Sequence, residues 1–161
     1  INFHMKNDYL NIYNNLIKLT RNKKIFLNLK NNDTFSDRLI ILLFHFAFFI
    51  KFYKKILSKN EAQDLFDFFI RQIELSIREI GYGDVSVNKK MKEYVNLFYS
   101  ILEKIELWEE FDKDKKIEIF SDLMNIKEDN DFFVDYFDKY NSFIINNPLK
   151  IFTKDILDFK F

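Results

Sequence analysis

The sequence Leu39-Ile-Ile-Leu-Leu-Phe-His45-Phe-Ala-Phe-Phe-Ile50 is the longest apolar run of the chain, with only His45 inside it. A helix needs roughly 18 to 20 apolar residues to span a bilayer, so this run is too short. Asp33 or Thr34 can cap a helix of about 20 residues that contains the run. Because such a helix is apolar nearly all round, we expect it to be buried at the centre of the fold or, as an alternative, to lie at an interface.

Amphipathic helical patterns flank this run on both sides. In the first of them, Tyr9, Ile12, Tyr13, Leu16 and Ile17 follow helical spacing. A capping box at Ser58-Lys59-Asn60-Glu61 predicts that another helix begins near Lys59. Together the patterns predict helices over residues 6–21, 59–81, 87–105, 114–124 and 131–145, in addition to the central one.

The composition agrees with a helical domain. The chain has 161 residues, of which 48% are hydrophobic, and it contains only two glycines and one proline. This length is typical of one domain, and so few glycines and prolines favour helices joined by polar turns. We therefore predict an all-α, single compact domain of about six helices over residues 1–148. Asn146-Asn147-Pro148 ends it, and residues 149–161 form a loosely attached tail.

Charge is distributed unevenly along the sequence. The net charge is zero, but residues 1–60 hold 11 Lys and Arg against 3 Asp and Glu, and the rest of the chain is acidic. A basic half can bind anionic lipid or RNA, which would make the protein a peripheral membrane- or ribosome-associated adaptor. The two halves can equally attract each other within one fold.

Both glycines lie in one short turn, Gly81-Tyr82-Gly83-Asp84, between two strongly periodic helices. Gly81 can end the first helix in a left-handed conformation, and Gly83 can allow a tight turn. Asp84 or Ser86 can cap the next helix. A phosphate-binding loop is a weaker alternative, because neither the Walker pattern nor the dinucleotide-binding pattern is present.

The residues around this turn carry a family resemblance. The segment Leu75-Ser-Ile-Arg-Glu-Ile-Gly-Tyr-Gly-Asp-Val-Ser-Val-Asn-Lys-Lys-Met-Lys92 resembles the pattern LRExGxGDxSVxxxxK of the ubiquinol-cytochrome c chaperone family. The chain looks like a bacterial-type member of it. Matching pieces extend the resemblance from about residue 8 to 110, namely Tyr9 with Arg21, Asp33 to Arg38, Phe44-His45, Leu65 to Asp67 and Phe98-Tyr99.

The resemblance implies a helical assembly chaperone without catalytic activity or cofactor. Its partner would be newly made cytochrome b or another subunit of complex III, the ubiquinol-cytochrome c reductase, and a second assembly factor is a further candidate partner. It would act in the cytoplasm at the inner face of the cytoplasmic membrane, which corresponds to the mitochondrial matrix side in organellar members. Peripheral contact with membrane or ribosome is compatible with this role, and recognition of a nucleic-acid sequence is not expected.

We expect client contact at the glycine turn. Arginine suits bidentate contacts with a loop of the client, and further charges and an aromatic ring lie close by. An alternative is that Arg78 or Lys92 pairs with an acidic neighbour and only fixes the angle between the two helices. The candidate client-binding residues are Arg78, Glu79, Gly81, Tyr82, Gly83, Asp84, Lys89 and Lys92.

Four further residues are secondary candidates. Arg38 follows Asp37, and Asp67 precedes Arg71 by one helical turn. Each charged pair lies close to an apolar stripe, where burial would require the charges to pair, so we expect both pairs to brace the core. His45 is expected to be a neutral histidine bonded within the core, with haem ligation as a weaker alternative.

Other classes of function find little support in the sequence. The absence of cysteine excludes disulfides, thiolate metal sites and cysteine nucleophiles. No combination of histidine and carboxylate predicts a metal or catalytic site, so we expect neither an enzyme nor a cofactor. The N-terminus shows no signal-peptide pattern, and its start at Ile1 suggests a fragment of a longer protein.

Overall fold

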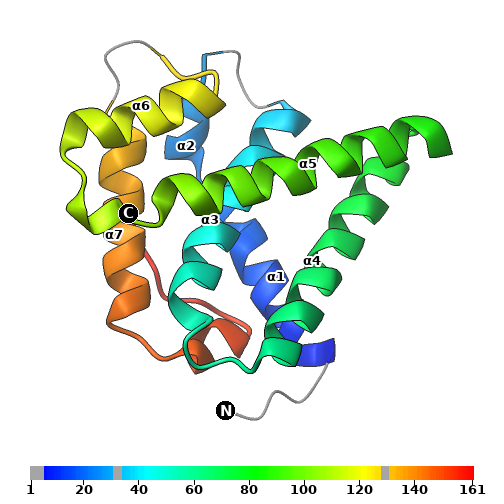
Figure 1. Cartoon of the computed structure of the whole chain (residues 1–161), viewed down its shortest axis with the longest axis horizontal. Coiled ribbons are helices and arrows are strands. Elements are labelled where there is room, and N and C mark those ends of the chain that lie inside the picture. Colours follow the sequence, from blue (N-terminus) through cyan, green and yellow to red (C-terminus); the bar gives the residue numbers. More distant parts are fainter. Residues whose placement is uncertain (1–5, 31–33, 128–130) are drawn as a thin grey trace.

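The structure is a computed structural model, and it describes residues 6–30, 34–127 and 131–161. Within these residues the fold is all-α, as predicted, and β-structure is limited to one bridge between Leu29 and Ile126 (Figure 1). The α-helices are α1 (Lys6–Thr20), α2 (Lys23–Leu27), α3 (Phe35–Tyr53), α4 (Lys59–Glu79), α5 (Asp84–Ile105), α6 (Lys113–Leu123) and α7 (Phe132–Ile145). Two short 3-10 helices, η1 (Trp108–Glu110) and η2 (Leu149–Thr153), complete the described part.

Helix α3 contains the long apolar run and lies at the centre of the molecule, so the prediction of a buried helix is confirmed. Thr34 caps it, because its hydroxyl accepts a hydrogen bond from the backbone N–H of Asp37. The other predicted cap, Asp33, lies outside the described residues. Every side chain of α3 from residue 41 to 49 is buried.

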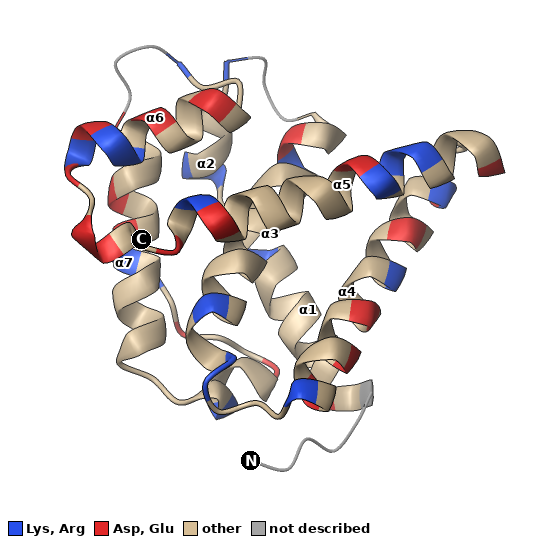
Figure 2. Ribbon diagram, in the orientation of Figure 1, with Lys and Arg blue, Asp and Glu red and all other residues tan. Residues whose placement is uncertain are grey.

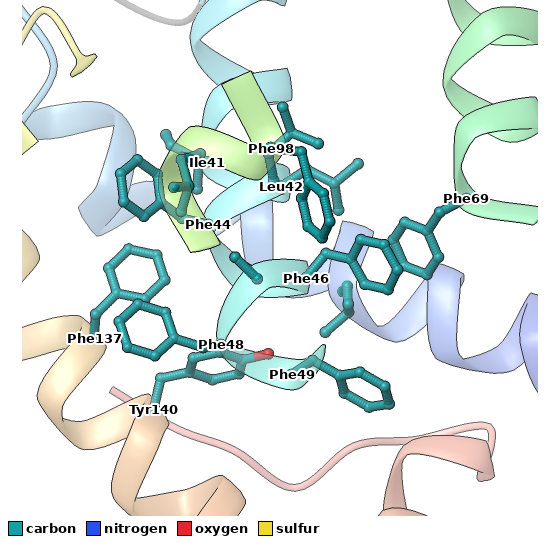
Figure 3. Close-up of a cluster of buried hydrophobic side chains, with 14 of the residues drawn as sticks. Ile41, Leu42, Phe44, Phe46, Phe48, Phe49, Phe69, Phe98, Phe137 and Tyr140 are labelled. Atoms are coloured by element: carbon teal, nitrogen blue, oxygen red, sulfur yellow. The ribbon is translucent and has the colours of Figure 1, made fainter. Parts of the chain in front are cut away.

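Aromatic rings join α3 to its neighbours (Figure 3). The ring of Phe46 stacks on Phe69 of α4, with centroids 3.7 Å apart, and also on Phe98 of α5. On the other side, the ring of Phe48 stacks on Phe137 of α7. Such pairs add roughly 0.5–1.5 kcal/mol each to the stabilisation from area burial, so α3 ties the two sides of the molecule together.

The predicted helix boundaries agree with the structure to within a few residues. The capping box is confirmed, since Ser58 accepts from the N–H of Glu61 and the Glu61 carboxylate accepts from the N–H of Ser58. The short helix α2 was not predicted. Its five residues are too few to show a helical period, and the side chain of Asn22 caps it.

Residues 149–153 are packed firmly, so the prediction of a loosely attached tail is wrong for this segment. Leu149 and Phe152 are fully buried. The amide of Asn15 on α1 donates to the backbone carbonyls of Phe152 and Lys154, at 2.9 and 2.7 Å. Helix α1 therefore supplies both an apolar surface and polar anchors for η2.

Candidate functional site

The turn between α4 and α5 forms an exposed tip. The two helices diverge from it with α1 and α3 between them, and the turn projects beyond the rest of the body (Figure 1). Every residue from 78 to 86 is exposed. This segment, which we call the hairpin tip, contains six of the eight predicted client-binding residues, and Lys89 and Lys92 follow, also exposed, on α5.

Only one of the two glycine positions requires glycine for its backbone conformation. Helix α4 ends at Glu79, and Gly81 has a φ of +99°, the left-handed conformation that the sequence predicted. Gly83 has a φ of −74°, which any residue adopts. Gly83 also takes the N-cap position of α5, so the prediction that Asp84 or Ser86 caps this helix is wrong. The helix begins three residues before the predicted start at residue 87, with Asp84 already in its first turn.

Ion pairs connect α4 to α5 across the turn. Nη1 of Arg78 lies 2.6 Å from Oδ1 of Asp84, and Nε of Arg78 lies 3.3 Å from the carboxylate of Glu74. Hydrogen bonds from the guanidinium to Asp84 and then to Glu74 raise the pKa of Arg78. The same oxygen of Glu74 pairs with Arg71. Arg78 therefore pairs with an acidic neighbour, as expected from the alternative in which such a pair fixes the angle between the two helices.

Two apolar members of the tip were not predicted from the sequence. The side chains of Ile80 and Val85 are 51% and 86% exposed, and Tyr82 between them is 42% exposed. Nζ of Lys90 lies 4.7 Å from the centroid of the Tyr82 ring, a cation–π arrangement. In sequence, Ile80 continues the apolar stripe of α4. At this end, however, the hairpin projects beyond the rest of the molecule, so Ile80 is exposed (Figure 1). Val85 lies off the stripe of α5, which is the signal that could have identified it.

His45 lies in the core, far from the tip. Its Nδ1 lies 2.9 Å from the carbonyl oxygen of Ile41, and its Nε2 lies 2.6 Å from the hydroxyl of Tyr136. A carbonyl only accepts, so Nδ1 carries the proton and Nε2 accepts from Tyr136. Burial lowers the pKa of His45 to about 3, so the ring is neutral. This is the bonded core histidine that the sequence predicted, and both ring nitrogens are occupied.

The other secondary candidates lie apart from one another. Arg71 forms an ion pair with Glu74, which also pairs with Arg78 of the tip. Asp67 instead accepts a hydrogen bond from the side-chain amide of Gln63 one turn earlier on α4. Both Asp67 and Arg71 are exposed, so the prediction that this pair braces the core is wrong. With no burial to compel the pairing, Arg71 pairs with Glu74 instead. Arg38 is exposed near the start of α3 and lines a pocket between α1, α3 and α4.

Charged residues occur on most helices rather than on two separate faces (Figure 2). Lys51, from the basic part of the sequence, lies 2.7 Å from Glu109, from the acidic part. Hydrogen bonds from Lys51 and Asn141 lower the pKa of Glu109 against the opposing effect of burial. Attraction between the two parts of the sequence is therefore present within the fold.

The described residues lack two further kinds of feature. None of the helices there is both long and apolar enough to cross a membrane. The same residues contain no cluster of three or more histidine, aspartate or glutamate side chains that could hold a metal ion.

These features define an all-α protein with an exposed hairpin tip that carries both apolar and charged side chains. Residues 27–118, more than half of the chain and including this tip, match the family model described as ubiquinol-cytochrome C chaperone. The chain therefore belongs to the ubiquinol-cytochrome c chaperone family. No curated protein and no solved structure gave a significant match.

Proposed function

We propose that this protein is an assembly chaperone that binds newly made cytochrome b through the hairpin tip and promotes assembly of complex III, without catalysing a reaction itself. The observation that carries the proposal is the exposure of Ile80, Tyr82 and Val85 at the end of a projecting helical hairpin. Exposed apolar side chains that lie together commonly mark a binding surface. The family membership supports the assembly role.

The charges at the tip support this role in a second way. Arg78 and Asp84 pair with each other at an exposed position, where an ion pair contributes little to stability. Each partner can therefore exchange its contact for one with a client at small cost. Lys89 and Lys92, exposed on α5, add positive charge beside the apolar side chains.

Co-purification of cytochrome b with tagged protein tests the proposal. We expect the Ile80→Ser, Val85→Ser double variant to recover several-fold less cytochrome b than wild type. The Arg78→Ala, Asp84→Ala double variant removes one charge of each sign and should also lower recovery. Its matched control is Lys115→Ala, Glu118→Ala, an exposed pair on α6 whose removal leaves the net charge equally unchanged.

Equal recovery with all of these variants would remove the tip from client recognition. If another subunit of complex III or a second assembly factor is recovered in place of cytochrome b, and its recovery depends on the tip, the partner must be revised while the site stands. Melting temperatures of the variants, measured by circular dichroism, show whether a loss reflects unfolding.

A second candidate function is peripheral contact with the membrane or the ribosome, at the inner face of the cytoplasmic membrane. The observation that favours it is the bend between α3 and α4, where Lys54, Lys55 and Lys59 are all exposed. Attraction of such a cluster to anionic lipid or RNA weakens as salt rises. Sedimentation with anionic vesicles and with ribosomes should therefore fall steeply with salt, and a salt-insensitive association would contradict this role.

A further inference from the structure

A small pocket opens between α1, α3 and α4. Its volume is ≈ 140 Å³. Ile17, Phe35, Leu39 and Leu42 form its apolar lining, and Leu39 and Leu42 are almost completely buried. An apolar cavity of about 150 Å³ is large enough to hold a benzene ring. The pocket can therefore take a ring or a branched aliphatic group of similar size.

Polar groups converge on the same pocket. Arg21 and Arg38 line it, together with the hydroxyl-bearing residues Tyr13, Thr20 and Ser76. Burial raises the pKa of Tyr13, whereas the Ser76 hydroxyl and the guanidinium of Arg21 lower it, because both favour the ionised phenol. Arg21 itself lines the pocket, so its charge can act on a group inside it. The charge of Glu79 also reaches Tyr13 and acts in the opposite direction to that of Arg21.

A ligand that matches these groups has two parts. Guanidinium groups form paired, charge-assisted hydrogen bonds with planar carboxylates. A mostly apolar pocket with a few convergent polar groups is typical of sites for small organic ligands. We propose that this pocket binds an organic carboxylate, with the carboxylate against Arg21 and an apolar group of about benzene size between Ile17 and Leu42.

The same chemistry can come from two sources. One is a free aromatic or branched aliphatic acid, and the other is the C-terminal residue of a polypeptide when that residue is Phe or Leu. The inference is independent of client binding at the hairpin tip. Four of the lining residues also lie outside the residues that match the family model, namely Tyr13, Ile17, Thr20 and Arg21.

Titration of ¹⁵N-labelled wild-type protein, followed by NMR, tests the site. Phenylacetate is compared with phenylacetamide, which keeps the ring and lacks the charge. N-acetyl-Gly-Phe with a free carboxylate is compared with its C-terminal amide. We expect the two acids to shift backbone signals of α1 and α3 around Ile17 and Leu39, and each amide to bind at least tenfold more weakly than its acid. The tighter of the two acids identifies the source.

Two variants separate the pocket from non-specific attraction. Arg21→Gln should weaken binding of the better acid at least tenfold, whereas Arg71→Gln, which removes an exposed arginine on α4, should leave it unchanged. Equal binding of acid and amide, equal effects of the two substitutions, or absence of shifts with both acids would overturn the proposal. The comparison of acid with amide needs only wild-type protein, so it holds even if Arg21→Gln fails to fold.

Discussion

At the scale of single residues, the buried His45 shows how a polar group is satisfied in an aromatic core. The rings of Tyr136, Phe137 and Tyr140 surround it, and the hydroxyl of Tyr140 donates to its backbone carbonyl. Burial raises the pKa of Tyr136, so this hydroxyl keeps its proton and remains a donor to Nε2. A neutral imidazole with both nitrogens bonded costs little to bury, whereas an unpaired one would be expensive.

Substitution of Tyr136 by phenylalanine should destabilise the protein. The change removes the donor to Nε2 of His45 and leaves a buried acceptor without a partner, which costs roughly 1–3 kcal/mol. Chemical denaturation measures the loss of unfolding free energy. The control Tyr99→Phe removes a hydroxyl from a side chain that is 53% exposed and should change stability by less than about 0.5 kcal/mol. Equal losses for the two variants would contradict the role of this hydrogen bond.

His45 should also make stability depend on pH. Its pKa is about 3 in the folded protein and near 6.5 in the unfolded chain, so between these values only the unfolded state binds the proton. Stability therefore falls as pH decreases from 6.5 towards 3, with a slope of up to about 1.4 kcal/mol per pH unit from this residue. The unfolding free energy of wild type, measured from pH 7 to 4, should fall more steeply than that of His45→Gln. Parallel curves would contradict the assignment.

At the scale of elements, the α4–α5 hairpin has some features that depend on its local sequence and others that depend on how it packs against the rest of the molecule. The left-handed Gly81 and the capping box at Ser58 depend on neighbouring residues, so the sequence predicted both. The exposure of Ile80 could not be predicted, because periodicity shows which face is apolar but not where the supporting helices end. The pairing of Arg71 with Glu74 could not be predicted either, because it depends on the exposure of Arg71 and Asp67, which leaves them free of any need to pair with each other.

The two glycines should respond differently to alanine. A side chain at Gly81 would force a φ of +99° on an L-residue, which costs roughly 1–2 kcal/mol, although the space around it is open. Gly83 has an ordinary φ and equally open surroundings, so Gly83→Ala should cost less than Gly81→Ala, on the order of 0.5 kcal/mol, because alanine is a poorer N-cap residue than glycine. Thermal and chemical unfolding of both variants provide the measurement. A larger loss for Gly83→Ala than for Gly81→Ala would contradict the turn geometry.

At the scale of the whole molecule, segments far apart in sequence complete one core. Phe152 of the tail packs against Phe49 and Tyr53 of α3 and against Phe143 of α7. The sequence predicted the all-α class and the central helix, because both follow from composition and local periodicity. It could not predict the docking of η2, since the amide of Asn15 bonds carbonyls more than one hundred residues away.

This docking predicts a strong effect of a substitution in the tail. Phe152→Ala should lower the unfolding free energy by roughly 3–5 kcal/mol, as expected when a buried phenylalanine ring is removed. Ile156→Ala, three residues beyond η2 at a side chain that is 80% exposed, should have almost no effect. Urea denaturation of the two variants tests the difference. A negligible effect of Phe152→Ala would mean that the tail is loosely attached after all.

The most direct test of the account is site-specific photo-crosslinking of the hairpin tip to its client. A photoreactive benzoylphenylalanine is placed at Val85, which is 86% exposed in the tip, or at the similarly exposed Ile156 in the tail. During synthesis of complex III subunits, we predict that position 85 forms a crosslink to cytochrome b and that position 156 does not. A client crosslink at position 156 with none at position 85, in protein that still supports assembly of complex III, would contradict client binding at the tip.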